Sequence, residues 1–236
     1  MNRFFVIRPR GDELRRIFEA KIDKKEQSSK YTLIETEWGE ELGLVLGEIK
    51  CHKVKAQGKI IKFFKENDRD LESYLLNAEN KEKKAFINFR DLVKKHKLDK
   101  AGMKPIKAYL TFDQKKMIFY YTAPKRIDFR NLLKDLISTF PNVIRLQQIN
   151  QRQESLILGG CGICGREFCC HQFLRELLKI SRDSLEENLG GISSIDKMRG
   201  PCGYLRCCLT YERDDFKKLK KLPKKEKSSK IDVDKK

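Results

Sequence analysis

Seven closely spaced cysteines are the residues of this sequence best suited to chemistry. The chain has eight cysteines, and all except Cys51 lie between Cys161 and Cys208. The apolar run that begins at Met1 is too short for a signal peptide, so we expect a reducing compartment. Clustered thiols in such a compartment hold a metal or carry out redox chemistry more often than they form disulfides. The pattern therefore predicts that this stretch coordinates a metal ion or an iron–sulfur cluster.

Six of these cysteines form two copies of one heptapeptide, C-G-x-x-x-C-C. The first copy runs from Cys164 to Cys170 and the second from Cys202 to Cys208, 38 residues further along. Each copy follows glycine or proline, which suits a loop that bends around an ion and directs backbone N–H groups at thiolate sulfurs. The candidate ligands for a cofactor are Cys164, Cys169, Cys170, Cys202, Cys207 and Cys208.

The spacing leaves the nature of the centre open. Thiolates hold zinc, usually through C-x-x-C pairs, or iron–sulfur clusters, usually through runs of closely spaced cysteines. The spacing within each copy is ordinary for neither, although Cys161 forms one C-x-x-C pair with Cys164. For a bound metal ion, the first choice of ligands is Cys164, Cys169, Cys202 and Cys207. Cys161 is an additional candidate.

Two residues in this stretch also have a structural interpretation. A cysteine is a common small core residue, and a helix starting near Arg166 would place Cys170 on an apolar face with Phe173 and Leu174. Cys170 is therefore either a ligand or a packing residue. His171 could be a ligand, but a lone histidine beside an amphipathic helix is more often a structural or surface residue. Cys51, far away in the sequence, is interpreted as incidental.

The elements that position the cysteines predict an α+β fold. Alternation of apolar residues predicts strands at 31–36 and 42–49, joined by a turn containing Gly39. Helical spacing of apolar residues then predicts a long helix from 68 to 96. Before these elements, Leu14, Ile17 and Phe18 indicate a short helix.

A β-β-α-β unit is predicted next. Alternation indicates a β-hairpin over 106–122, and an apolar stripe from Phe129 through Ile137 to Phe140 indicates a helix capped by Asp128. A strand over 143–149 completes the unit, and the cysteine-rich loop and helix region is expected to follow that strand directly.

The predicted domains are an N-terminal segment, 1–30; the N-terminal β element and long helix, 31–100; the β-β-α-β unit with the duplicated motif, 101–215; and a basic flexible tail, 216–236.

The chain is strongly basic, with 52 lysines and arginines, 34 acidic residues and a formal net charge of +18. Such a surplus favours an acidic partner, such as nucleic acid, an anionic membrane surface or an acidic protein. A lysine-rich surface without a dedicated partner explains the charge equally well. No stretch is long and apolar enough for a transmembrane segment. We therefore expect a cytoplasmic protein, with peripheral association with the membrane as an alternative.

Several segments together resemble the bacterial YaaT (RicT) family, whose shared region is called the polymerase-suppressor C-terminal domain. The resemblance lies in Gly159 through Cys170 and in Gly200 through Glu212, and it extends upstream to 127–130 and 144–149. It covers roughly residues 30 to 212. Cys161 stands where an aliphatic residue is expected, so the resemblance assigns it no role.

The resemblance implies a non-enzymatic regulatory subunit that works with small helical proteins of the YlbF and YmcA type. In that family such complexes carry [4Fe–4S] clusters and influence messenger-RNA maturation through ribonuclease Y, with effects on sporulation, competence and biofilm formation. A partner of this kind could supply some of the cluster ligands.

Two other classes of function remain open. A zinc-stabilised nucleic-acid-binding module would use the basic surface for RNA contact. A thiol oxidoreductase would need one reactive cysteine and a resolving partner. Hydrolase and transferase chemistry is disfavoured, because the sequence has neither a glycine-rich phosphate loop nor a recognisable pair of catalytic carboxylates.

Overall fold

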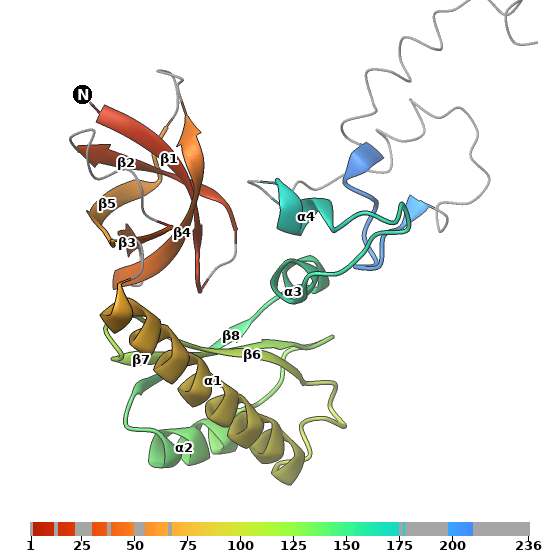
Figure 1. The fold of residues 1–236 in the computed structure, drawn as a ribbon. Coiled ribbons are helices and arrows are strands. Elements are labelled where there is room, and N and C mark those ends of the chain that lie inside the picture. Colours follow the sequence, from red (N-terminus) through yellow and green to blue (C-terminus); the bar gives the residue numbers. More distant parts are fainter. Residues whose placement is uncertain are drawn as a thin grey trace, which may run out of the picture. The chain divides into compact units, whose positions relative to one another are not determined.

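The computed structural model describes residues 2–11, 14–21, 30–36, 39–49, 55–65, 68–174, 177 and 198–209. Cys51 and the predicted flexible tail, 216–236, lie outside these residues. The chain divides into two compact units, Met1–Leu177 and Leu178–Lys236. The first unit contains a β-barrel, a three-stranded sheet with its helices, and the first cysteine copy, whereas the second unit contains the second copy (Figure 1).

A closed five-stranded barrel forms the N-terminal part of the first unit. Its strands are β1 (Asn2–Pro9), β2 (Arg16–Lys21), β3 (Tyr31–Thr36), β4 (Gly39–Ile49) and β5 (Gly58–Phe63). They are ordered β1-β2-β5-β3-β4, and the barrel closes through antiparallel pairing of β1 with β4. Closure leaves no unpaired sheet edge. The core of the barrel is apolar and consists of Phe5, Ile7, Phe18, Ala20 and Ile34.

The barrel confirms the strands predicted at 31–36 and 42–49 and corrects what was expected before them. Ile17 and Phe18 belong to strand β2 and not to a helix. Both side chains are buried although they are neighbours, so this strand lacks the alternation that would have revealed it. Because β1 and β2 pair into the same barrel as the later strands, the boundary predicted at residue 30 falls inside a single folded element.

The predicted long helix is confirmed as α1 (Arg69–Lys95). Asp68 caps its N-terminus, since its side chain accepts hydrogen bonds from the N–H groups of Asp70 and Leu71. Lys94 and Lys95 in the last turn complement the negative end of the helix dipole.

The predicted β-β-α-β unit is also confirmed. It consists of β6 (Lys104–Leu110), β7 (Lys116–Thr122), α2 (Arg130–Thr139) and β8 (Val143–Gln148). Strand β7 is central, antiparallel to β6 and parallel to β8. Helices α1 and α2 cover the same face of the sheet (Figure 1). The core between them is made of Ala85, Phe89, Val93, Met103, Ala108, Leu110, Met117, Phe119, Tyr121, Leu132 and Leu136.

Details of helix α2, and of the segment that follows strand β8, differ from the predictions. The N-cap position of α2 is Phe129, and the Asp128 carboxylate accepts a hydrogen bond from the Arg130 N–H. Ile137, predicted on the apolar stripe, is exposed. A further helix, α3 (Gln151–Leu158), separates β8 from the cysteines. Asn150 and Gln153 form a capping box at its N-terminus, a signal that the sequence contained.

A partly buried ion pair joins the barrel to α1. Both guanidinium Nη atoms of Arg10 donate to the Glu82 carboxylate, at 3.0 and 2.8 Å. The Leu110 N–H donates to the same carboxylate at 2.9 Å, and Lys107 Nζ donates to the Arg10 carbonyl oxygen at 3.2 Å. Burial raises the pKa of Glu82, and the charge of Arg10 opposes this effect. The carboxylate therefore depends on Arg10 to remain charged inside the protein.

Gly11 sits where the barrel meets the sheet, and replacing it with alanine is expected to destabilise the protein. A Cβ on Gly11 would lie 2.6 Å from Cε1 of Tyr109, a residue that is only 1% exposed. We expect Gly11→Ala to lower the free energy of unfolding by about 1–3 kcal/mol in urea denaturation. Gly47→Ala is the control, because no atom lies within 4 Å of its Cβ position. Equal effects of the two substitutions would contradict this packing.

Candidate metal centre

The first cysteine copy is a tight hairpin that follows α3. Cys161 and Glu167 form an antiparallel bridge, the Gly162 N–H donates to the Arg166 carbonyl at 2.8 Å, and the Gly165 N–H donates to the Gly162 carbonyl at 3.0 Å. Gly165 has a φ of +75°, which favours glycine. The chain then enters the short helix α4 (Cys169–Gln172).

The second cysteine copy has the same backbone hydrogen bonds. Arg199 and Leu205 form the bridge, the Gly200 N–H donates to the Tyr204 carbonyl at 2.8 Å, and the Gly203 N–H donates to the Gly200 carbonyl at 2.9 Å. Gly203 has a φ of +74°. Each residue is the counterpart of one 38 positions earlier, so the sequence duplication is also a duplication of structure.

The thiols of the two copies differ in exposure. The pair Cys161 and Cys164 is exposed, whereas Cys170 is buried at 7% exposure. The remaining thiols are partly exposed and belong to Cys169, Cys202, Cys207 and Cys208. None of these seven described cysteines is in a disulfide. The burial of Cys170 agrees with its interpretation as a packing residue, and its counterpart Cys208 is less buried.

The chemistry of these donors fits a thiophilic metal, but the described residues of neither unit provide a full coordination sphere. Within the ranges that the structure covers, no three His, Cys, Asp or Glu side chains lie close enough together to hold a metal ion. Cysteine thiolates suit zinc and iron–sulfur clusters, and each copy offers two or more at fixed positions on a hydrogen-bonded loop.

His171 anchors the first copy to its surroundings. Its Nδ1 lies 2.9 Å from the carbonyl oxygen of Leu156 in α3, so Nδ1 carries the proton in this contact. Its Nε2 lies 3.4 Å from Arg8 Nη1 and 3.5 Å from Glu167 Oε1, and Arg15 Nη2 donates to its backbone carbonyl at 3.4 Å. These contacts give His171 a structural role, one of the two alternatives to a ligand that the sequence suggested.

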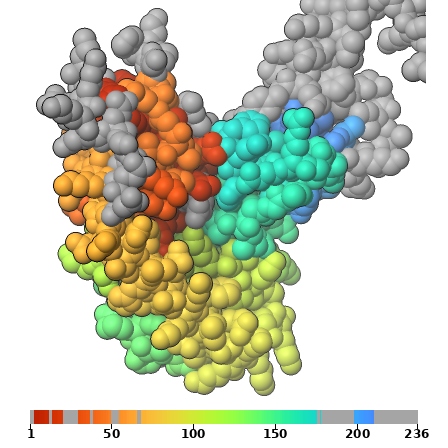
Figure 2. Space-filling model, viewed as in Figure 1, coloured from red at the N-terminus to blue at the C-terminus, as the bar shows by residue number. Residues whose placement is uncertain are grey.

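Basic side chains of the barrel face this anchor. Burial lowers the pKa of the Arg15 guanidinium, and the positive charge of Arg8 acts in the same direction, whereas Glu167 opposes it. Figure 2 shows the segment with α3 and α4 against both the barrel and the sheet. Arg8 and Arg15 could not be linked to His171 from the sequence, because they lie 163 and 156 positions before it.

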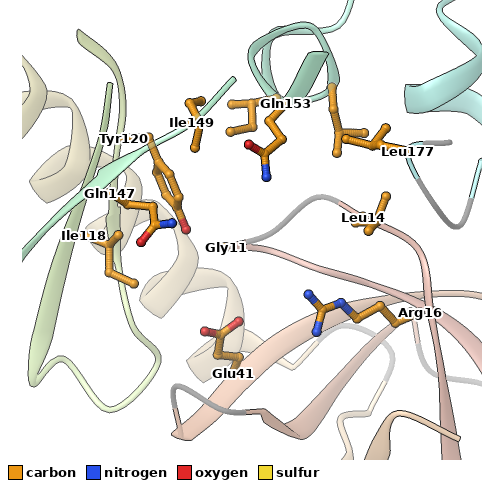
Figure 3. Close-up of a pocket in the computed structure, with 12 residues that line it drawn as sticks. Gly11, Leu14, Arg16, Glu41, Ile118, Tyr120, Gln147, Ile149, Gln153 and Leu177 are labelled. Carbon is orange, nitrogen blue, oxygen red and sulfur yellow. The ribbon is translucent and has the colours of Figure 1, made fainter. Parts of the chain in front are cut away.

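A cavity of about 160 Å³ lies elsewhere in the first unit, between the barrel, the sheet face opposite α1 and α2, and helix α3. Figure 3 shows the polar ends of Tyr120 and Gln153 directed into this space. Gln153 also closes the capping box of α3. The other polar residues that line the cavity are Arg16, Glu41 and Gln147. No motif indicated this cavity, since its walls come from separate parts of the chain.

Two segments of the chain match described regions of one protein family. Residues 58–149, from β5 to the end of the sheet, match the PSP1 C-terminal conserved region, and residues 193–223, which include the second cysteine copy, match the third domain of PSP1-like proteins. Both matches are to regions of PSP1-like proteins and confirm the resemblance to the YaaT family that the sequence indicated.

A particular relative is the stage 0 sporulation protein YaaT of Bacillus subtilis (strain 168). The two sequences are 40% identical over 157 residues, a match that covers 65% of this chain and 54% of YaaT. The chain therefore matches about half the length of this curated relative. No solved structure matches the chain. Among the described residues, no helix is long and apolar enough to cross a membrane.

Proposed function

We propose that this chain is a non-enzymatic regulatory subunit whose duplicated cysteine loops hold an iron–sulfur cluster in a complex with small helical proteins of the YlbF and YmcA type. The similarity to a sporulation protein supports a regulatory role. The proposed complex modulates ribonuclease Y-dependent messenger-RNA maturation in the cytoplasm, with consequences for developmental regulation. The observation that carries the proposal is the repeated hairpin, which places thiols at equivalent positions twice.

The residues that would hold a [4Fe–4S] cluster are the thiols in the turn of each hairpin and just after it, Cys164, Cys169, Cys202 and Cys207, with ligands from a partner where these do not suffice. A cluster bound by thiolates of separate loops would fix the distance between those loops. Because metal binding and local folding are coupled, occupancy would determine which surface is presented to partner proteins. The glycine turn of each loop, and in the first copy also the anchored His171, would hold the loop in position for binding.

The experiment that tests the regulatory role is co-expression of the full chain with YlbF- and YmcA-type proteins under anaerobic conditions, followed by size-exclusion chromatography. We expect a stable assembly, and we expect the double substitution Cys164→Ser and Cys202→Ser to dissociate it. The matched control is Cys51→Ser, which changes a cysteine outside both copies. A chain that elutes alone in every case would contradict the proposal.

A zinc-stabilised nucleic-acid-binding module is the alternative, and the net charge of +18 favours it. This alternative predicts specific RNA binding whose log affinity falls steeply with log salt concentration. The regulatory proposal predicts instead that RNA affinity stays at the non-specific level and is lost when residues 216–236 are deleted. Filter binding of RNA at several salt concentrations separates the two functions.

A further inference from the structure

The two hairpins differ at one chemically important position. Cys161, which forms the bridge in the first copy, corresponds to Arg199 in the second. In the second copy, Arg199 Nη1 donates to the Gly203 carbonyl at 2.7 Å, so the side chain at this position extends over the turn. In the first copy the same backbone position holds Cys161, three residues before Cys164 in the turn.

Cys164 folds back toward the beginning of its hairpin. A Cβ placed on Gly162 would be 3.4 Å from Cys164 Sγ, so this thiol lies close to the residue that follows Cys161. The equivalent distance in the second copy, from a Cβ on Gly200 to Cys202 Sγ, is 3.7 Å. Both thiols of the first copy are exposed and neither is in a disulfide.

We propose that Cys161 and Cys164 are a redox-active dithiol that closes reversibly into a disulfide within the first hairpin. Disulfides need their two Cα atoms within a few ångströms, which a hairpin closed by two backbone hydrogen bonds favours. The second copy lacks this chemistry because a guanidinium stands in place of the second thiol.

The oxidant is a low-molecular-weight disulfide. The thiolate of one cysteine attacks a sulfur of this oxidant, so that a mixed disulfide forms and one small thiolate leaves. The thiolate of the other cysteine then attacks the protein-bound sulfur, which forms the Cys161–Cys164 bond and releases the second small thiolate. Two electrons pass to the oxidant, and the two protons of the cysteines end on the two small thiols.

The redox-active dithiol is inferred from the geometry of the first hairpin. Only the effect of its oxidation on cluster binding rests on the proposed function. Oxidation would remove the Cys164 thiolate from the set of cluster ligands while leaving Cys202 and Cys207 reduced. The disulfide would therefore prevent the first copy from binding the cluster, while the second copy would keep its ligands. The first copy would thus be the redox-sensitive half of the duplicated motif.

The test uses the reduced, metal-free full chain in glutathione buffers with increasing proportions of glutathione disulfide. Free thiols are alkylated, and the peptides from tryptic digestion are weighed. Cleavage after Arg152 and Arg166 gives a peptide whose only cysteines are Cys161 and Cys164. We expect this peptide to escape alkylation and to lose about 2 Da, the mass of two hydrogen atoms, as the buffer becomes more oxidising.

Two variants make the result decisive. In Cys161→Ser, the internal disulfide should be lost and a glutathione adduct on Cys164 should accumulate in its place. In Arg199→Cys, the second copy gains the same pair, and the peptide from Met198 to Arg206 should show the same loss of about 2 Da.

The proposal is overturned if the wild-type peptide carries glutathione adducts to the same extent as Cys161→Ser, or if Cys164 is bonded to a cysteine outside the hairpin. Because the isolated chain contains no metal in this experiment, its outcome is independent of whether the assembled complex contains iron.

Discussion

Arg10→Met is expected to lower the free energy of unfolding by about 3 kcal/mol at neutral pH, because it leaves a partly buried carboxylate without its charged partner. Arg10 donates two hydrogen bonds to Glu82, whose side chain is only 11% exposed. Methionine preserves much of the side-chain volume beside the Tyr109 ring, over which the guanidinium of Arg10 lies. The loss therefore reports mainly on the charge. Urea denaturation at several pH values measures it.

The pH dependence of this loss follows from the direction of the pKa shift. Burial raises the pKa of Glu82 above its ordinary value of 4.5, and removing Arg10 raises it further. A carboxyl group whose pKa is higher in the folded state binds its proton more tightly there. The variant should therefore lose stability relative to the wild type as the pH rises from the raised folded-state pKa of wild-type Glu82 toward the still higher folded-state pKa of the variant, and recover most of it in acid.

Arg130→Ala is the control for this prediction. Arg130 lies 2.6 Å from Asp128, and hydrogen bonds from Arg130 lower the pKa of that carboxyl to about 2. Both side chains are exposed, so solvent screens their attraction and we expect no measurable change in stability. The account of the ion pair fails if Arg10→Met is equally harmless, or if its effect is the same at pH 4 and pH 8.

Replacing Cys169 or Cys207 with serine is expected to reduce the iron content of the assembled complex by about tenfold or more. The two positions follow the same hairpin in the two copies, and serine keeps the size of the side chain but removes the thiolate. Iron is measured per complex after anaerobic purification of each single variant.

Two controls accompany these variants. Cys51→Ser removes a cysteine outside the duplicated motif and should retain the iron. Cys170→Ala changes the buried thiol, and retention of iron in this variant would assign Cys170 to packing. The ligand assignment is wrong if Cys169→Ser and Cys207→Ser both retain the iron of the wild type.

The fold could be predicted where local periodicity was strong. Helix α1 and the β6–β7 hairpin have regular apolar spacing, and their predicted limits agree with the structure to within a few residues. Strand β2 was missed because the neighbours Ile17 and Phe18 are both buried in a closed barrel. Strand β5 was missed because its partners, β2 and β3, come from more distant parts of the chain. Long-range pairing of this kind leaves little local signal.

The same distinction applies to the candidate site. Its two cysteine loops could be recognised because each copy of the heptapeptide and the glycine or proline before it are consecutive in the sequence. The anchoring of His171 by Leu156, Arg8 and Arg15 could not, because these contacts depend on how the barrel packs against α3. Helix α3 is an intermediate case, since its capping box was present in the sequence but was overlooked.

Iron and acid-labile sulfide analysis of the anaerobically purified complex tests the central claim most directly. The account predicts a brown protein with iron and sulfide in equal amounts, about four of each per cluster. Zinc should be present only in trace amounts. A colourless complex that contains stoichiometric zinc and no sulfide would contradict the proposed iron–sulfur centre.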